Sequence, residues 1–83
     1  MNPSDRIWQA IDCDAAFTSD GRPQPRTITW RGESLPVHDS GRRWTDGDGL
    51  HLLARVEDGR VFELHYNGAA WWGRVISAPP PIA

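Results

Sequence analysis

The stretch that decides the fold of this chain is Leu50–Ser77, LHLLARVEDGRVFELHYNGAAWWGRVIS. Three runs of alternating apolar and polar residues are separated by two glycine-containing segments, Glu57-Asp58-Gly59 and Asn67-Gly68. Alternation with a period of two is typical of half-buried strands, and glycine next to Asn or Asp is typical of hairpin turns. The stretch therefore predicts a three-stranded antiparallel meander.

The length of the first turn sets which residues face each other across its hairpin. A two-residue turn at Asp58-Gly59 would mix polar and apolar side chains on each face. A three-residue loop with Gly59 in the left-handed backbone region separates them. The apolar pairs that this loop predicts are Ala54 with Phe62, Leu52 with Leu64 and Leu50 with Tyr66.

The second turn decides which of two adjacent tryptophans is buried. As a two-residue type I′ turn, Asn67-Gly68 places Trp71 in the core and Trp72 on the outer face. The outer face then carries one row of Leu53, Glu63 and Trp72 and a second row of Arg55, Val61 and Arg74. An exposed tryptophan among arginines is typical of an interface hot spot or of a base-stacking surface. The alternative is that a second layer covers Trp72 and makes it core.

The N-terminal half also favours strands. Residues 26–30 and 33–38 flank Arg31-Gly32, a two-residue turn that sets Ile28 opposite Leu35. Because proline cannot donate to a sheet, Pro36 indicates that its strand lies at a sheet edge or turns its amide position outward. Residues 7–17 fit a short helix or a strand, and we favour the strand because an isolated short helix is marginally stable.

Residues 39–49 form a long polar segment around Trp44, which we interpret as a loop. We expect a tryptophan in so polar a loop to fold back over one end of the core. Together, these elements predict an all-β fold of five or six short strands in antiparallel meander order. Such a meander makes a strongly bent sheet or a small SH3-like barrel.

Length and composition predict one small domain in the cytoplasm. Of the 83 residues, we assign 1–78 to the domain and 79–83 to an extended proline-rich tail. Cys13 is the only cysteine, so an internal disulfide is excluded and a reducing compartment fits best. No apolar run approaches the roughly 18 residues of a membrane span, and the start lacks a signal-peptide pattern. A formal net charge of −2 gives no overall field that attracts nucleic acid.

Three groups of residues match chemical sites only superficially. Asp46–Gly49 matches the start of a calcium-binding EF-hand loop, but Leu50 stands at its fifth position and no helical pattern flanks it. His51 and His65 face each other on the predicted strands, but a zinc site needs three or four ligands. Cys13 lies between two aspartates, whose charges raise a thiol pKa. We therefore expect no enzyme, no metal and no cofactor.

A set of short motifs resembles a family of bacterial domains of unknown function. The matching residues are Asp20-Gly21-Arg22-Pro23, Ile28-Thr29-Trp30-Arg31-Gly32, Trp44, Arg55-Val56 through Gly59, Phe62-Glu63-Leu64, Trp71-Trp72 and Arg74-Val75. Domains of this family occur alone and as tails of Y-family-polymerase-like proteins of mutagenic DNA repair. The resemblance implies a small all-β domain, names no catalytic residue and suggests a DNA-repair setting.

The sequence as a whole predicts a non-enzymatic interaction module. The leading hypothesis is a domain that binds a protein partner or a second copy of itself through the outer face. The alternative is binding of single-stranded nucleic acid by the same face. The residues predicted to make contact are Trp72, Arg74, Arg55 and Leu53, with Arg42 and Arg43 added for nucleic acid. A third hypothesis is a metal-dependent enzyme at the two histidines.

Overall fold

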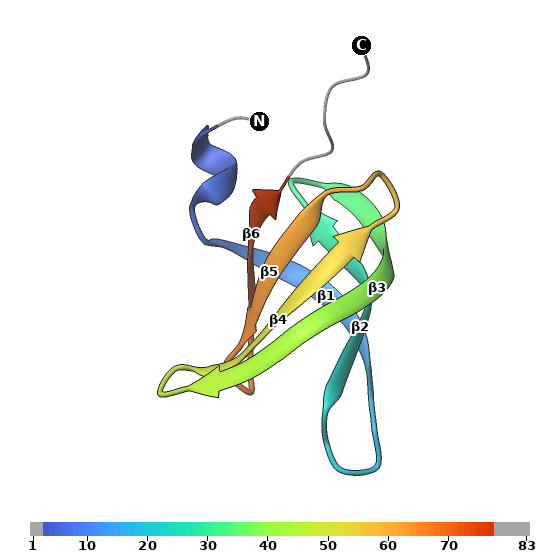
Figure 1. The fold of residues 1–83 in the computed structure, drawn as a ribbon, viewed down its shortest axis with the longest axis vertical. Coiled ribbons are helices and arrows are strands. Elements are labelled where there is room, and N and C mark those ends of the chain that lie inside the picture. Colours follow the sequence, from blue (N-terminus) through green and yellow to red (C-terminus); the bar gives the residue numbers. More distant parts are fainter. Residues whose placement is uncertain (1–2, 78–83) are drawn as a thin grey trace.

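The computed structural model describes residues 3–77, so the predicted tail, residues 79–83, lies outside the described residues. After one turn of 3₁₀-helix, η1 (Pro3–Arg6), the chain forms six strands (Figure 1). They are β1 (Gln9–Phe17), β2 (Pro23–Trp30), β3 (Glu33–Asp46), β4 (Gly49–Val56), β5 (Val61–Tyr66) and β6 (Trp71–Ser77). Within residues 3–77, no helix has the length and apolar character needed to cross a membrane.

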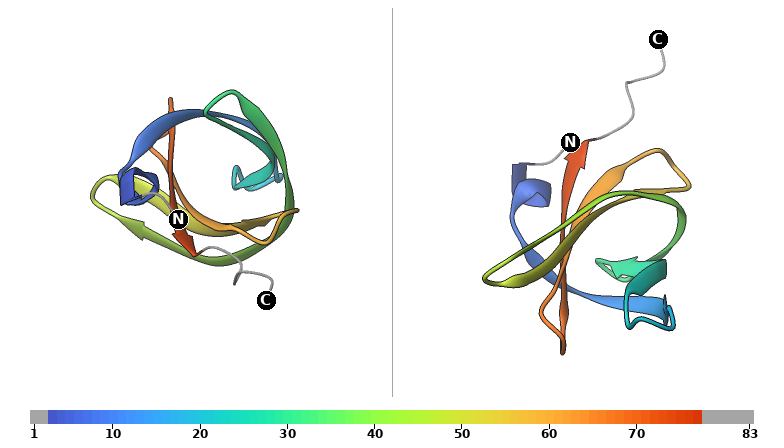
Figure 2. Two further views of the ribbon diagram at one scale, coloured as in Figure 1. Left: turned by 90° about the horizontal axis from the view of Figure 1, so that it is seen from above. Right: turned by 60° about the horizontal axis from the view of Figure 1, so that its bottom comes forward.

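The six strands close into an antiparallel barrel. Each strand pairs with the next in the chain, and β6 returns to pair with β1 (Figure 2, left). The predicted all-β meander is confirmed, and it closes as a small barrel. Of the two placements predicted for the strand around Pro36, the sheet edge is wrong, because β3 pairs with β2 on one side and with β4 on the other. Closure satisfies backbone groups that an open sheet edge would leave unpaired.

The β4–β5 hairpin has the predicted register. Leu52 pairs with Leu64 and Ala54 with Phe62, as the three-residue loop requires. Gly59 has a φ of 94°, in the left-handed region, and its N–H donates to the Val56 carbonyl. The apolar side chains of both strands therefore point to the same side, into the barrel.

The β5–β6 hairpin has a longer loop than predicted. Four residues, 67–70, connect the strands, and the Asn67 side-chain oxygen accepts hydrogen bonds from the N–H groups of Ala69 and Ala70. As a result, Trp72 pairs with His65. The predicted pairing of β6 against β5 is therefore wrong by two residues. Trp72 does not lie beside Glu63, and Arg74 lies beside Glu63 and not beside Val61. An even shift leaves every side chain on its predicted face, since sides alternate with a period of two.

The N-terminal half is built from strands, as expected. Residues 9–17 form β1, which excludes the helical alternative for that segment. Ile28 pairs with Leu35 as predicted. Arg31 and Gly32 have φ values of 49° and 80°, as a two-residue type I′ turn requires.

The segment predicted as a polar loop is mostly strand. Residues 39–46 continue β3, which pairs with β4 along its length and absorbs two register shifts, after Val37 and after Ser40. Trp44 pairs with His51, so it lies on the outer face and does not cap one end of the core. The β3–β4 hairpin extends past the barrel body (Figure 1). Polar residues fit the far end of β3 because most side chains of residues 39–46 are exposed.

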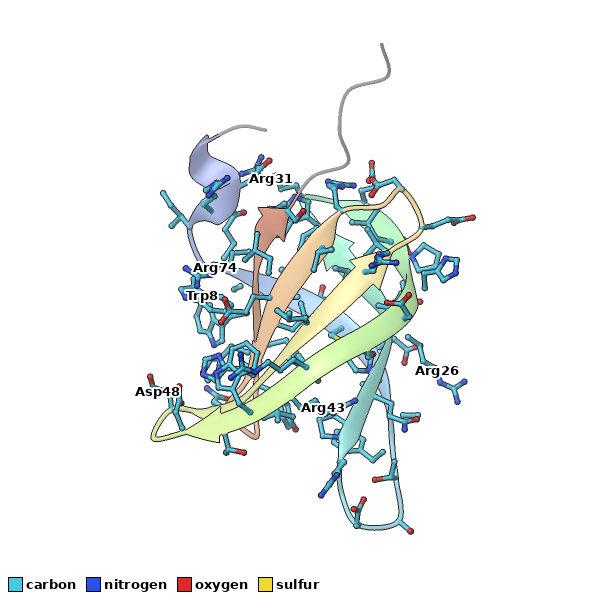
Figure 3. The ribbon with its side chains drawn as sticks, viewed as in Figure 1. Trp8, Arg26, Arg31, Arg43, Asp48 and Arg74 are labelled. Atoms are coloured by element: carbon cyan, nitrogen blue, oxygen red, sulfur yellow. The ribbon has the colours of Figure 1, made fainter. Side chains whose placement is uncertain are left out.

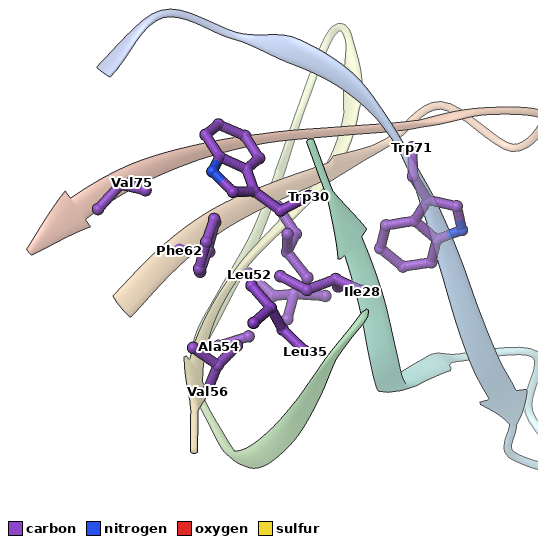
Figure 4. Packing of buried hydrophobic residues seen from close by; sticks show 10 residues of the cluster. Ile28, Trp30, Leu35, Leu52, Ala54, Val56, Phe62, Trp71 and Val75 are labelled. Carbon is purple, nitrogen blue, oxygen red and sulfur yellow. The ribbon is translucent and has the colours of Figure 1, made fainter. Parts of the chain in front are cut away.

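The core fills the barrel with side chains from five strands (Figure 4). Its buried members are Ile28, Trp30, Leu35, Leu52, Ala54, Val56, Phe62, Leu64, Trp71 and Val75. The Trp30 ring meets the Phe62 ring edge-on at 5.1 Å. Because these apolar side chains are closely packed inside the barrel, the strands hold the residues on the outer face in fixed positions.

Candidate interaction surface

A row of four aromatic or imidazole rings crosses the outer wall of the barrel. Strand pairing aligns Trp44 of β3 with His51 of β4, His51 with His65 of β5, and His65 with Trp72 of β6. Trp8, just before β1, lies against the two histidines, with ring centroids 6.2 and 6.1 Å apart. We call these five residues the aromatic face.

The rings of the aromatic face are packed against one another. The imidazoles of His51 and His65 stack with centroids 4.5 Å apart. The Trp44 indole lies parallel to His51, at 5.3 Å and an interplanar angle of 6°. His51, in the middle, is only 8% exposed, whereas Trp72 at the end of the row is 36% exposed. The centre of the row is therefore fixed by packing, and its Trp72 end is open.

Two arginines stack on this face from its sides. The Arg74 guanidinium lies 4.7 Å from the Trp8 ring centroid, and that of Arg42 lies 5.4 Å from the Trp44 ring centroid. Arg74 also donates from Nε and Nη2 to Oε1 of Glu63, at 3.1 and 2.7 Å. Figure 3 shows Trp8 and Arg74 together next to β6. Arg74 therefore holds Trp8 in place and neutralises the buried Glu63.

Carboxylates surround His51. Asp46 Oδ2 lies 2.9 Å from His51 Nε2, and Glu63 Oε2 lies 3.4 Å from His51 Nδ1. The two carboxylates thus face the two imidazole nitrogens, which are both buried. The backbone N–H of Asp48 donates to Asp46 Oδ1 at 2.8 Å, and this bond, more than His51, lowers the pKa of the Asp46 carboxyl. Asp46 is therefore negatively charged at neutral pH.

A shallow pocket of about 300 Å³ opens on the aromatic face. It is lined by Trp8, Asp48, His51, His65 and Trp72. Asp48 comes from the tip of the β3–β4 hairpin, which reaches past the barrel body toward Trp8 (Figure 3). The pocket therefore combines tryptophan rings, imidazoles and one carboxylate.

The predicted contact residues do not all lie together. Trp72 belongs to the aromatic face, and Arg74 adjoins it. Leu53 lies one row away, opposite Glu63, and Arg55 lies in a further row, where it forms a 3.6 Å ion pair with the exposed Asp39. Trp72 and Arg74 are thus brought together, while Leu53 and Arg55 occupy the neighbouring part of the same wall.

Arg42 and Arg43 are separated by the register shift in β3. Arg42 stacks on Trp44 and adjoins the aromatic face. Arg43 is opposite the inward-facing Leu52 and donates from Nη1 to the Pro23 carbonyl at 2.7 Å, on the other side of the β3–β4 hairpin (Figure 3). The two arginines therefore do not form one basic patch.

The sequence interpretation missed Trp8 and misplaced Trp44. Trp8 precedes β1 and reaches the histidines only because β1 closes the barrel against β6. The polar residues around Trp44 predict a loop, whereas the structure has a strand there. A signal for the row was present, since Trp44, His51, His65 and Trp72 all sit at outward positions of strands, but only the correct loop length aligns them.

The two histidines and Cys13 are the groups that the sequence singles out for chemistry. His51 and His65 face each other as predicted. Within residues 3–77, no group of three or more His, Cys, Asp and Glu side chains is placed to hold a metal ion. Burial, and secondarily the charge of Asp14, raise the pKa of the Cys13 thiol to about 12, which suppresses the nucleophilic thiolate.

Comparison of the chain with models of protein families, with curated proteins and with solved structures gives no match. The resemblance of its motifs to the bacterial domain family therefore stays a prediction. What the chain does has to be inferred from its own surface.

Proposed function

We propose that this protein is a non-enzymatic interaction module that binds a protein partner through the aromatic face. The observation that carries the proposal is the position of Trp72. It is 36% exposed at the rim of a pocket on a packed barrel wall, and no ring or cation of the described residues stacks on it. Large aromatic side chains at the centre of a fixed surface supply most of the free energy of many protein interfaces.

The neighbouring side chains support this role. Trp8 is only partly buried and lines the same pocket as Trp72, so a partner that covers Trp72 also covers Trp8. Trp44, also partly buried, lies at the other end of the row. The arginine on the Trp8 ring, Arg74, is already held by its hydrogen bonds to Glu63. Little side-chain freedom is therefore lost on binding, which favours affinity.

Single-stranded nucleic acid is the second candidate, because bases stack on exposed tryptophans. The charge of the aromatic face favours a protein partner over nucleic acid. Asp48 lines the pocket, and Asp46 is bound to its backbone. Arg74 is neutralised by Glu63 and Arg43 faces elsewhere, which leaves Arg42 beside the aromatic face. Few cations are left to contact phosphates, which dominate nucleic-acid affinity.

The test is affinity capture from native lysate, with and without nuclease. The wild type is compared with Trp72→Ala and with the control Phe17→Ala, which removes an aromatic that is 56% exposed at the far end of β1. We expect a protein partner that is retained after nuclease treatment, kept by Phe17→Ala and lost by Trp72→Ala. With the purified partner, the dissociation constant should rise about 30-fold in Trp72→Ala, as for an interface hot spot.

Ionic strength separates the two candidates. A nucleic-acid ligand would lose affinity steeply between about 50 and about 200 mM salt, whereas an aromatic protein contact would change little. Nuclease-sensitive capture together with a steep salt dependence would refute the protein-binding proposal in favour of the nucleic-acid one. Equal capture by the wild type and Trp72→Ala would refute both.

A further inference from the structure

We propose that the pocket of the aromatic face takes a cationic side chain, the ammonium of a lysine or the guanidinium of an arginine, presented by the partner. This inference rests on the proposed function and adds the chemical class that the pocket recognises. It is carried by the ring faces of the pocket and by its charge.

The tryptophans next to the pocket already bind cations of the chain itself. The Arg74 guanidinium lies over Trp8, and the Arg42 guanidinium lies over Trp44. Trp72 lines the same pocket as Trp8, is partly exposed and carries no such cation from the described residues. Indole faces attract cations through the ring quadrupole, most strongly among the aromatic side chains. Trp72 therefore provides a ring face that an external cation can occupy.

The charge of the pocket has the matching sign. Within residues 3–77, Asp48 is the only acidic residue that lines the pocket, and no arginine lines it. The charged Asp46 is bound to the backbone of Asp48 and adds a second negative charge nearby. Arg74 does not cancel these charges, because it is paired with Glu63. An anionic ligand would be repelled here and a cationic one attracted.

His51 links the pocket to further negative charge. Its imidazole lines the pocket, and Asp46 Oδ2 and Glu63 Oε2 lie 2.9 and 3.4 Å from its Nε2 and Nδ1. Two carboxylates therefore lie next to a ring that lines the pocket, and one of them, Glu63, is paired with Arg74.

The experiment uses three small probes on the full chain: the N-acetyl methylamides of lysine, arginine and norleucine. Norleucine has the apolar stem of lysine without its charge. Binding is followed through the indole N–H signals of Trp72 and Trp8 in nitrogen-15 NMR spectra. We expect both cationic probes to move these two signals and to bind about tenfold more tightly than norleucine, within the range measured for cation–ring contacts.

Substitutions localise the effect. Asp48→Asn removes a lining charge at an exposed position, so we expect it to weaken both cations severalfold and to leave norleucine unchanged. The matched control is Asp39→Asn, which removes an exposed carboxylate that pairs with Arg55 elsewhere on the wall, and should change nothing at the pocket. Equal affinities for lysine and norleucine, or cation binding that is insensitive to Asp48→Asn, would overturn the proposal. The proposal would also be overturned if an oligothymidylate moved the indole N–H signal of Trp72 and neither cationic probe did.

The same variants separate this inference from the proposed function. If Trp72→Ala loses the captured partner while Asp48→Asn and excess arginine probe leave capture unchanged, the interaction module stands and the cation pocket is refuted. If the cations bind the pocket but Trp72→Ala captures the partner normally, the proposed function fails and the preference of the pocket holds.

Discussion

At the scale of single residues, two neighbouring tryptophans have opposite environments. Trp71 is 9% exposed and stacks on Tyr66, with ring centroids 4.6 Å apart. Trp72 points outward from the same strand and is 36% exposed. Adjacent side chains on a strand point to opposite faces, so the backbone step that buries one exposes the other.

Replacing each tryptophan by alanine should therefore have different effects on folding. Trp71→Ala empties a large buried site and should lower the free energy of unfolding by about 3–5 kcal/mol. Trp72→Ala removes a side chain that faces solvent and should lower it by less than about 1 kcal/mol. Urea unfolding followed by far-UV circular dichroism measures both, and equal losses would contradict the assignment of the two faces.

Cys13 should be nearly inert in the folded protein. Its pKa is raised from 9.0 to about 12, first by burial and then by Asp14, so at pH 8 its thiolate fraction is about a thousandfold below that of the unfolded chain. Alkylation by iodoacetamide, followed by mass spectrometry, should be slower in buffer than in denaturant by a similar factor, and equal rates would count against this. Because the folded pKa lies above the unfolded one, this group lowers stability as pH rises above about 9.

At the scale of elements, three of the hairpin loops are held by an aspartate. Asp20 accepts a hydrogen bond from Thr18 in the β1–β2 loop. Asp46 accepts the N–H of Asp48 after β3, and Asp58 accepts bonds from Arg60 after β4. In each case the leading cause of a lowered carboxyl pKa is one of these hydrogen bonds. The charged form of each aspartate therefore stabilises its turn.

Acid should weaken these turns together. A carboxyl whose pKa is lowered by folding stabilises the fold fully above its unfolded pKa, near 3.9, and loses that contribution as pH falls through the folded value. We expect the free energy of unfolding to decrease as pH falls below about 4, as measured by urea unfolding at several pH values. In a variant with Asp20→Asn, Asp46→Asn and Asp58→Asn, this decrease should be smaller. An unchanged pH profile in that variant would show that other carboxylates are responsible.

At the scale of the whole molecule, barrel closure depends on one short seam. The β1–β6 pairing joins Gln9–Ile11 to Trp71–Gly73, three residue pairs, whereas the β4–β5 pairing has six. A methyl group on Gly73 would lie 3.1 Å from the Ile11 side chain, so the strands approach closely there. The same seam brings Trp8 against the histidines, and closure therefore positions the aromatic face.

The seam should be the first part of the barrel to open. Short pairings lose their hydrogen bonds at lower free energy than long ones, so amide hydrogens that join β1 to β6 should exchange faster than those that join β4 to β5. Hydrogen exchange by NMR measures both sets under native conditions. The indole signal of Trp8 should broaden or shift in conditions that speed exchange at the seam. Equal protection of both strand pairs would show that the barrel opens only as a whole.

Much of the fold is predictable because its determinants are local. The strands of the meander follow from alternation, and Gly59 and Arg31-Gly32 have the positive φ values that their turns require. The loop after β5 was mispredicted because Asn67 bonds to residues 69 and 70, which a two-residue turn does not allow. Trp44 was misplaced because bulges let a polar segment continue as a strand.

Most of the strands, the alternation of their faces and the opposite orientations of Trp71 and Trp72 follow from the sequence alone, since these depend on neighbours in the chain. Only the tertiary structure decided that the sheet closes and that Trp8, Trp44, the two histidines and Trp72 meet around one pocket. The physical reason is distance along the chain: these rings come from segments up to 64 positions apart, and their meeting depends on loop lengths, bulges and closure that no local pattern fixes.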